Sequence, residues 1–192
     1  MKFDTIERRG LPDDEAIRAN YAQVKDYAAH LAENIKRGYG MILAGGYGTM
    51  KTTLAVAVLR AHIDAGEMGM FVPMCSLMDN LFTMRELSRE EWARYEKRIR
   101  STHLLVLDDL GSEDTGKSWV RAKADSIITE RYNKMLPIIV TTNLTQEELL
   151  STYSGRIVDR LRNTSLYLTF GTGSQRRVIG DNMSKIAEVR GA

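Results

Sequence analysis

The chain has 192 residues, with 27 Lys and Arg, 25 Asp and Glu, three His and one Cys. This length predicts a single domain, 1–192, that can bury a substantial core. A formal charge of +2 excludes a histone-like protein that wraps nucleic acid, although a local basic groove stays open. Because Cys75 is the only cysteine, an intramolecular disulfide and a cysteine-based zinc site are excluded.

No segment has the character of a membrane span or a targeting peptide. No apolar run approaches the length of about 20 residues that a membrane helix needs. The start, MKFDTIERR, lacks the apolar stretch of a signal peptide. We therefore expect a cytoplasmic protein without a membrane partner.

Helical and strand patterns alternate along the chain. Apolar residues at steps of three and four predict helices, and short continuous apolar runs predict buried strands. In chain order we expect a helix over 17–35, a strand over 39–44, a helix over 51–65, a strand over 68–75, helices over 76–87 and 90–101, a strand over 104–107, a helix over 117–135, a strand over 138–142, helices over 146–153 and 155–162, and a strand over 166–170.

Two of these elements carry a further expectation. Pro73 confines the strand over 68–75 to a sheet edge or to the end of the strand. The helix over 90–101 is highly charged, with Glu90 and Arg94 four residues apart, so we interpret it as a solvated helix. Five short apolar strands that alternate with helices predict an α/β fold, a three-layer sandwich with helices on both faces of a central parallel five-stranded sheet.

The most informative motif is GGYGTMKTT, which follows a predicted strand and opens a predicted helix. Its glycines allow backbone N–H groups to surround a phosphate, and the helix N-terminus adds positive potential. Lys51 would reach the β- and γ-phosphates, and the Thr52 hydroxyl would bind Mg²⁺. A glycine-rich turn without a ligand is the alternative. The predicted nucleotide-binding residues are Gly45, Gly46, Tyr47, Gly48, Thr49, Met50, Lys51, Thr52 and Thr53.

Met50 departs from the phosphate-loop pattern, which asks for Gly at that position. A side chain there lies close to where the phosphates must be. It can weaken nucleotide binding, distort the loop or turn outward, and the sequence leaves all three open.

A second motif, LLVLDD, ends at Asp108 and Asp109. Carboxylates just after a buried strand lie at the carboxyl edge of a parallel sheet, where such sheets bind ligands. One carboxylate, Asp108, would hold Mg²⁺, and the next would orient or deprotonate the attacking water. Alone, an apolar run that ends in Asp-Asp is as easily a plain turn, but the phosphate loop before it strengthens the interpretation.

Two later segments offer weaker signals. Asn143 follows the apolar strand IIVTT and could sense the γ-phosphate or simply start a turn. The segment GRIVDRLR contains Arg156, Arg160 and Arg162, which composition alone would assign to a solvated helix face. The three histidines, His30, His62 and His103, have no metal-ligand spacing and are expected to be structural or exposed.

Taken in order, these segments resemble the helicase-loader branch of the AAA+ ATPases, the DnaC/DnaI loaders and the related IstB transposition ATPases. The resemblance covers about 3–177. It rests on GGYGTMKTTLA, LLVLDDLGSE, the ERY of 130–132, IIVTTNL, RIVDRL and FGTGSQRR. It implies a P-loop NTPase fold of the AAA+ type, with a core over about 13–177, a short lead over 1–12, a tail over 178–192 and no separate lid domain.

The resemblance also implies roles for individual residues. Lys51 and Thr52 become the Walker A ligands of phosphate and Mg²⁺, Asp108 becomes the Walker B carboxylate, and Asn143 becomes sensor 1. Asp109 stands where many AAA+ proteins have a catalytic Glu, which suggests slow, switch-like hydrolysis of ATP to ADP. The resemblance assigns the arginine finger, which would enter the site of a neighbouring subunit, to Arg160 first and Arg156 second.

The expected function is therefore an ATPase switch that binds single-stranded DNA and helps to place a replicative DnaB-type helicase on it. Self-association would be head to tail, so that a finger meets the next site. Full-length loaders carry an N-terminal helicase-binding domain, so the chain is expected to be a core-only loader or to contact the helicase differently. Candidate DNA contacts are Arg121, Lys123 and the helix from Arg94 to Arg100.

Two other functions stay open at this point. An IstB-like ATPase would have target DNA and a transposase as partners. Alternatively, Met50 disables the site and the fold serves as a scaffold that does not hydrolyse ATP.

Overall fold

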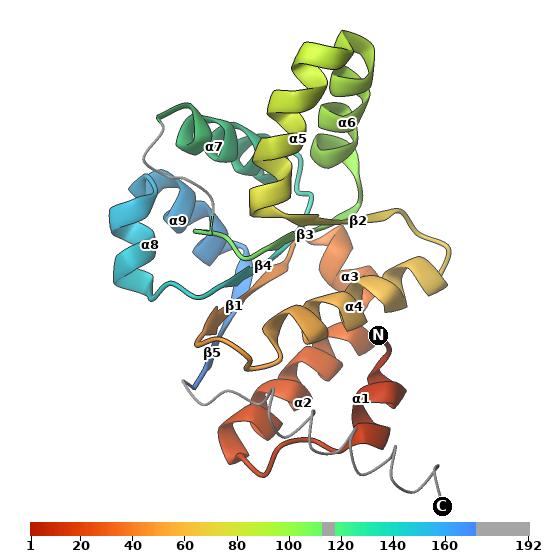
Figure 1. Ribbon diagram of the computed structural model, residues 1–192. Coiled ribbons are helices and arrows are strands. Elements are labelled where there is room, and N and C mark those ends of the chain that lie inside the picture. Colours follow the sequence, from red (N-terminus) through yellow and green to blue (C-terminus); the bar gives the residue numbers. More distant parts are fainter. Residues whose placement is uncertain (113–117, 172–192) are drawn as a thin grey trace, which may run out of the picture.

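The computed structural model of the chain describes residues 1–112 and 118–171. Its centre is a sheet of five parallel strands in the order β2-β3-β4-β1-β5 (Figure 1). The strands are β1 (Gly40–Gly45), β2 (Gly69–Pro73), β3 (Leu104–Asp108), β4 (Ile138–Thr142) and β5 (Ser165–Phe170). These bounds confirm the five predicted strands to within three residues at either end.

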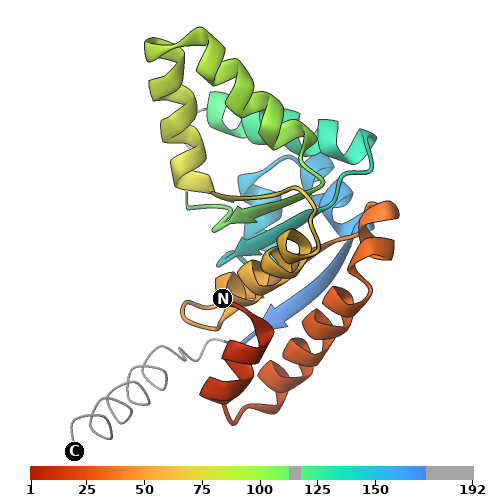
Figure 2. The ribbon, with the colours of Figure 1, turned by 90° about the vertical axis from the view of Figure 1, so that its right-hand side faces the viewer.

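Helices connect the strands and cover both faces of the sheet, as Figure 2 shows from the side. The described helices are α1 (Phe3–Arg9), α2 (Glu15–Ala29), α3 (Leu31–Lys36), α4 (Lys51–Asp64), α5 (Met74–Leu87), α6 (Arg89–Ser101), α7 (Ser118–Asn133), α8 (Gln146–Thr152) and α9 (Gly155–Asn163).

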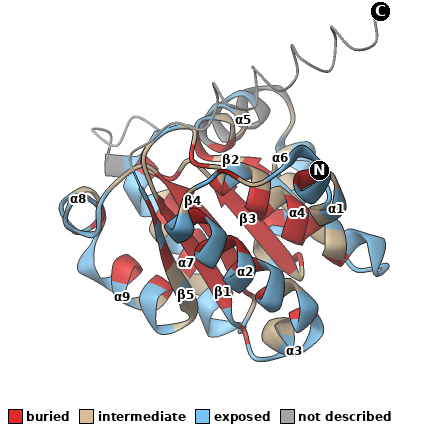
Figure 3. Cartoon of the chain, turned by 90° about the horizontal axis from the view of Figure 1, so that it is seen from below, coloured by how far each residue is buried: buried red, intermediate tan, exposed pale blue. Residues whose placement is uncertain are grey.

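The core has two halves because successive side chains of a strand point to opposite faces. On β1, Met41 and Leu43 pack with α1 to α4, whereas Ile42 and Ala44 pack with α5 to α9. Seen from below, the strands are mostly buried and the outer helix faces are exposed (Figure 3). This confirms the predicted three-layer arrangement.

The edge position predicted from Pro73 is confirmed. β2 pairs only with β3 among the described strands, and Pro73 is its last residue. The chain then enters α5 at Met74 without a loop.

Two predictions at the amino-terminal end are wrong in detail. The single helix expected over 17–35 is two helices, because the chain leaves helical geometry at His30, with φ −105° and ψ 25°. Across this break Asn34 donates its side-chain amide to the carbonyl of Tyr27 at 3.1 Å. α1 was not predicted, since it is seven residues long and buries only Ile6, too little for a periodic pattern.

Other expectations fall outside the described residues. These are the tail over 178–192, most of the FGTGSQRR motif, Glu113 of the DDLGSE motif and the start of the helix predicted over 117–135. Within the part of the chain that the structure describes, no helix is long and apolar enough to cross a membrane.

Candidate nucleotide-binding site

The loop between β1 and α4 has the backbone shape of a phosphate loop. Gly45 ends β1 with φ 141°, and a Cβ there would lie 2.1 Å from the carbonyl oxygen of Phe170, so the position needs Gly. Gly48 takes φ 75°, which Gly adopts without steric cost. α4 then begins at Lys51, and its N-terminus faces the loop.

Met50 adopts the conformation that the replaced glycine would favour. Its φ of 71° and ψ of 2° lie in the left-handed region, which costs a residue with a Cβ about 1–2 kcal/mol. Its side chain is partly buried and packs against the core cluster of α1 to α4. The backbone thus keeps the left-handed shape that Gly would take, and the partly buried Met50 both packs against the core and lines the pocket that the loop forms. Whether Met50 weakens nucleotide binding stays a prediction, which the titration proposed below tests.

Lys51 lies inside the loop and is 7% exposed. Its ammonium donates to the carbonyl oxygens of Gly45 at 2.8 Å and Gly46 at 2.6 Å, and to Oδ1 of Asn143 at 3.0 Å. The ammonium group thereby holds the loop against the end of β4 through these hydrogen bonds. A phosphate that enters the loop would compete for the same three N–H bonds.

The two residues predicted to bind Mg²⁺, Asp108 and Thr52, lie in direct contact. The Thr52 hydroxyl donates to Oδ1 of Asp108 at 2.8 Å, and the Thr141 hydroxyl donates to the same oxygen at 2.7 Å. A carboxylate flanked by hydroxyl groups is an all-oxygen donor set, which suits Mg²⁺. The residues present therefore fit the ion that the phosphate-loop pattern implies.

Asn143 connects the lysine to the second carboxylate. Its Nδ2 donates to Oδ1 of Asp109 at 2.5 Å, while its Oδ1 accepts from Lys51. Asp109 has a left-handed backbone, φ 59°, and its N–H donates to the Thr141 hydroxyl at 2.9 Å. These contacts fix the second carboxylate at the rim of the site, where it can orient a water molecule.

Sequence reasoning missed Thr141. It is buried at 2% exposure near the end of β4, and its hydroxyl contacts both Asp108 and the backbone N–H of Asp109 at the end of the neighbouring strand β3. The available signal was the pair of threonines that ends the otherwise apolar run IIVTT.

These residues surround a pocket of about 360 Å³ at the carboxyl edge of the sheet. A larger cavity of about 710 Å³ lies near the starts of β1 and β5, but its lining contains no Lys or Arg and one carboxylate, Asp26. Ligands of open parallel sheets bind at the carboxyl ends of the strands. The chemistry of the smaller pocket, rather than its size, makes it the candidate nucleotide site. Its lining residues are Tyr47, Gly48, Thr49, Met50, Lys51, Thr52, Thr53, Asp108, Asp109, Thr141 and Asn143.

The two finger candidates lie away from this pocket on α9. Arg156 is exposed. Arg160 is half-buried against α7, where it donates to the Thr129 hydroxyl and its guanidinium lies 5.6 Å from the ring centroid of Tyr132. Arg160 also lines a cavity with Tyr39 and Ser165, at the opposite edge of the sheet from the phosphate loop.

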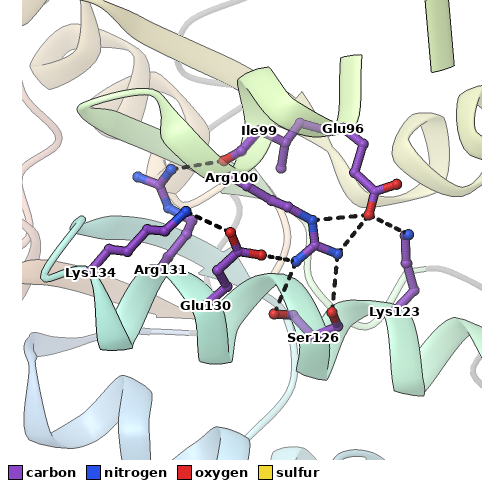
Figure 4. Close-up of polar contacts among 8 residues, drawn as sticks. All are labelled: Glu96, Ile99, Arg100, Lys123, Ser126, Glu130, Arg131 and Lys134. Atoms are coloured by element: carbon purple, nitrogen blue, oxygen red, sulfur yellow. Dashed lines mark hydrogen bonds and ion pairs between the residues drawn. The ribbon is translucent and has the colours of Figure 1, made fainter. Parts of the chain in front are cut away.

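Two of the candidate DNA contacts are engaged in an ion-pair network that joins α6 to α7 (Figure 4). Arg100 and Lys123 both donate to Oε1 of Glu96, at 2.7 Å and 2.6 Å. The Glu96 side chain is 14% exposed and that of Arg100 15%. The interpretation of α6 as a fully solvated helix is therefore wrong for the face that packs against α7. Arg94 on α6 and Arg121 on α7 are exposed.

The network shifts the acidity of its carboxylates. Burial alone would raise the pKa of Glu96, but hydrogen bonds from Lys123 and Arg100 outweigh it, and the net pKa is lowered. A hydrogen bond from Lys134 likewise lowers the pKa of Glu130, which also accepts from Arg100 at 2.6 Å.

The ERY motif has a structural role. Arg131 is fully buried and donates to the carbonyl oxygen of Ile99 at 2.8 Å (Figure 4). It also donates to the carbonyl oxygen of Pro137 at 2.9 Å. Burial lowers the pKa of Arg131 to about 10. This side chain ties the end of α6 to the loop that enters β4.

Two known proteins are similar to this chain in sequence. Over 164 residues, the chain is 25% identical to the replicative helicase loader DnaC of Escherichia coli (strain K12), which covers 83% of the chain and 64% of the relative. It is 30% identical over 161 residues to the replicative helicase loader DnaI of Bacillus subtilis (strain 168), which covers 79% of the chain and 48% of the relative. The chain thus spans less than two thirds of the length of these relatives.

Solved structures are similar to this chain as well. A crystal structure of the DnaC helicase loader superposes with a TM-score of 0.77 at 26% identity, covering 88% of this chain and 96% of the other. AMPPCP-bound DnaA from Aquifex aeolicus superposes with a TM-score of 0.71 at 19% identity, covering 91% and 53%, which shows a shared AAA+ fold. The model of the family described as "IstB-like ATP binding protein" matches residues 16–177. This chain belongs to the IstB-like ATP-binding protein family, with the AAA+ ATPase core of the DnaC and DnaI helicase loaders.

Proposed function

We propose that this chain is an ATP-dependent switch that helps to load a replicative DnaB-type helicase onto single-stranded DNA. The observation that carries the proposal is the hydrogen-bonded chain from Lys51 through Asn143 to Asp109. It links the phosphate-binding lysine to the carboxylate that would orient water, so that filling the loop must rearrange both. Such a coupling is what a nucleotide switch requires.

Each residue of the pocket has a role in this proposal. Lys51 binds the β- and γ-phosphates, and Thr52 and Asp108 hold Mg²⁺. The ion neutralises negative charge on the phosphates when it is bound. Asp109 orients the attacking water and accepts its proton, and Asn143 holds Asp109 in place. The Gly45 to Thr53 loop supplies the remaining N–H groups.

Assembly would complete the site. Arg160 and Arg156 lie on α9, away from the pocket of their own chain, so either would reach a phosphate only in a neighbouring subunit. Head-to-tail contact satisfies this geometry, since one surface then meets a different surface on the next copy. In other NTPases, an arginine finger raises the rate of hydrolysis by roughly 10³–10⁵-fold. If the finger comes from a neighbouring subunit, hydrolysis should depend on protein concentration, because the subunits must first assemble.

The helicase and DNA are partners by analogy with the relatives. DnaC and DnaI are replicative helicase loaders by name, and one similar structure is DnaA bound to AMPPCP and single-stranded DNA. Among the named candidates, the cations that stay exposed for a DNA backbone are Arg94, Lys97, Arg98 and Arg121. Binding of this kind should weaken as salt rises.

A transposition ATPase is the second candidate, because the matching family is the IstB-like one. Pull-down by a replicative helicase, and not by a transposase, would support the loader function. The reverse result would assign the chain to transposition.

The first test is an equilibrium titration with Mg-ATP of the natural chain, Met50→Gly and Lys51→Ala. We expect micromolar binding by the natural chain, which Lys51→Ala weakens and Met50→Gly preserves. Turnover should be lost in Lys51→Ala. If the natural chain fails to bind and Met50→Gly restores binding, the site is disabled by Met50 and the chain serves as a scaffold.

A further inference from the structure

Three potential metal ligands from separate segments meet at the amino ends of β2 and β3. His62 lies in the last turn of α4, Glu67 precedes β2, and His103 directly precedes β3. A ring nitrogen of each histidine and a carboxylate oxygen of Glu67 all lie within 4.8 Å of one another. Among the described residues, this group lies at the opposite edge of the sheet from Asp108 and the phosphate loop.

We propose that His62, Glu67 and His103 bind a divalent cation of the zinc class, with one coordination position left to water. Two imidazoles and one carboxylate are a ligand set that zinc takes in proteins, usually with water as the fourth ligand. Imidazole favours zinc, copper, nickel and cobalt over Mg²⁺ and Ca²⁺, which prefer oxygen. The group therefore differs in chemistry from the all-oxygen pair of Thr52 and Asp108.

The environment of His62 suits a metal ligand. The residue is 4% exposed, and its Nε2 lies 3.2 Å from the carbonyl oxygen of Met68. Metal-binding histidines commonly use one ring nitrogen for such a backbone contact, which fixes the ring. When Nε2 carries the proton, Nδ1 keeps the lone pair that a metal requires. The Thr102 hydroxyl donates to the same carbonyl at 3.1 Å and helps to hold it in place.

The other two ligands can adjust and are open to solvent. Nδ1 of His103 lies 2.9 Å from Oε2 of Glu67, and their side chains are 43% and 53% exposed. Ligand atoms around a tetrahedral zinc lie about 3.3 Å apart, given bond lengths near 2.0 Å. The described spacing of up to 4.8 Å thus needs movements of up to about 1.5 Å, which the exposed side chains of Glu67 and His103 can make. Exposure also provides an entry path for the ion.

A bound ion would join the end of α4 to the start of β3. α4 begins at the phosphate-binding residue Lys51 and ends two residues after His62. The ion would thereby cross-link three segments that are held at this point by contacts of the His62 ring and the Thr102 hydroxyl with the backbone carbonyl of Met68. Because it binds only where these segments meet, it should raise the melting temperature of the chain.

The test is calorimetric titration of the full, tag-free chain with ZnCl₂, in a Cys75→Ser background that removes the exposed thiol. We expect one equivalent to bind, and Glu67→Gln and His103→Ala to weaken binding at least about tenfold. Both substituted side chains are exposed, so the variants should fold. His30→Ala is the matched control, because His30 also contacts a carboxylate, Asp26 at 3.4 Å, without a second imidazole.

Two further measurements separate this site from the nucleotide pocket. Asp108→Asn should bind zinc as the background does, and zinc should raise the melting temperature of His30→Ala but not of His103→Ala. The proposal is overturned if the background chain does not bind zinc, or if His103→Ala and Glu67→Gln bind it with unchanged affinity. Loss of binding in Asp108→Asn would assign the zinc to the nucleotide pocket instead.

Discussion

Nζ of Lys51 lies 3.0 Å from Oδ1 of Asn143, although 92 positions separate the two residues in the chain. The contact joins the start of α4 to the end of β4. Asn143 also donates to Asp109, so the lysine and the second carboxylate share one amide group. A phosphate that attracts Lys51 would release one side of this amide and leave Asn143 free to reorient Asp109.

Asn143→Ala should uncouple binding from hydrolysis. Lys51 keeps its contacts to Gly45 and Gly46, so ATP affinity should change little. Turnover should fall by roughly 100-fold, as it does when one positioned polar group is removed from an active site. Steady-state ATPase kinetics with a parallel binding titration checks this. Asn163→Ala, which removes an exposed amide paired with Asp159, is the control. Turnover at the natural rate in Asn143→Ala would contradict the role of Asn143.

The left-handed backbone at Met50 predicts that substitution by Gly costs less stability than substitution by Ala, the reverse of the usual order within a helix. Both Met50→Ala and Met50→Gly lose the packing of the side chain, but Ala keeps a Cβ at a φ of 71°. Met50→Gly should therefore be more stable than Met50→Ala by about 1 kcal/mol, because Gly adopts left-handed backbone freely. Urea unfolding measures the difference. A lower stability of Met50→Gly would mean that the left-handed turn relaxes when the side chain shortens.

Substitutions on α9 should identify the arginine finger. If Arg160 is the finger, Arg160→Ala loses roughly 10³-fold or more in turnover while ATP still binds. The same variant should also lose about 1 kcal/mol of stability, because Arg160 contacts Thr129 and Tyr132. Arg156 is exposed, so Arg156→Ala should leave stability unchanged.

The control on the same helix is Arg162→Ala, since Arg162 is also exposed. ATPase rates at several protein concentrations, with calorimetric melting, check all three variants. Normal turnover in Arg160→Ala and its loss in Arg156→Ala would move the finger to Arg156.

The ion pairs between α6 and α7 should make stability depend on pH. The pKa of Glu96 lies below its ordinary value of 4.5, so the folded state favours the ionised carboxylate. Its contribution is fully present above pH 4.5 and is lost as the pH falls through the lowered folded pKa. Glu96→Gln should therefore cost about 2 kcal/mol at pH 7, and the difference from the natural chain should shrink below pH 4.5.

Denaturant unfolding at pH 7 and at acid pH measures this. Glu90→Gln is the matched control, because the Glu90 side chain is 90% exposed and its contact with Arg94 is 4.0 Å long. We expect that variant to change stability by less than about 0.5 kcal/mol. A Glu96→Gln difference that persists unchanged at acid pH would exclude the ion pairs as its source.

Local patterns in the sequence were enough to predict the strands and the phosphate loop. Buried parallel strands are continuous apolar runs, and the runs of β3 and β4 end in polar residues that mark the carboxyl edge, such as Asp108 and Asn143. The break at His30 was not predictable in this way, because the apolar spacing of Ala28, Leu31 and Ile35 continues through it.

The sequence by itself determined the sheet, the order of its motifs and the residue types at its carboxyl edge, since these depend on short-range patterns of polarity and backbone freedom. Only the tertiary structure decided that Met50 packs against the core and that Glu96 forms ion pairs with Arg100 and Lys123. It also decided that His62, Glu67 and His103 lie close together. Each of these depends on which elements pack together. Their residues lie far apart in the chain or face a neighbouring element, and no local spacing encodes such a contact.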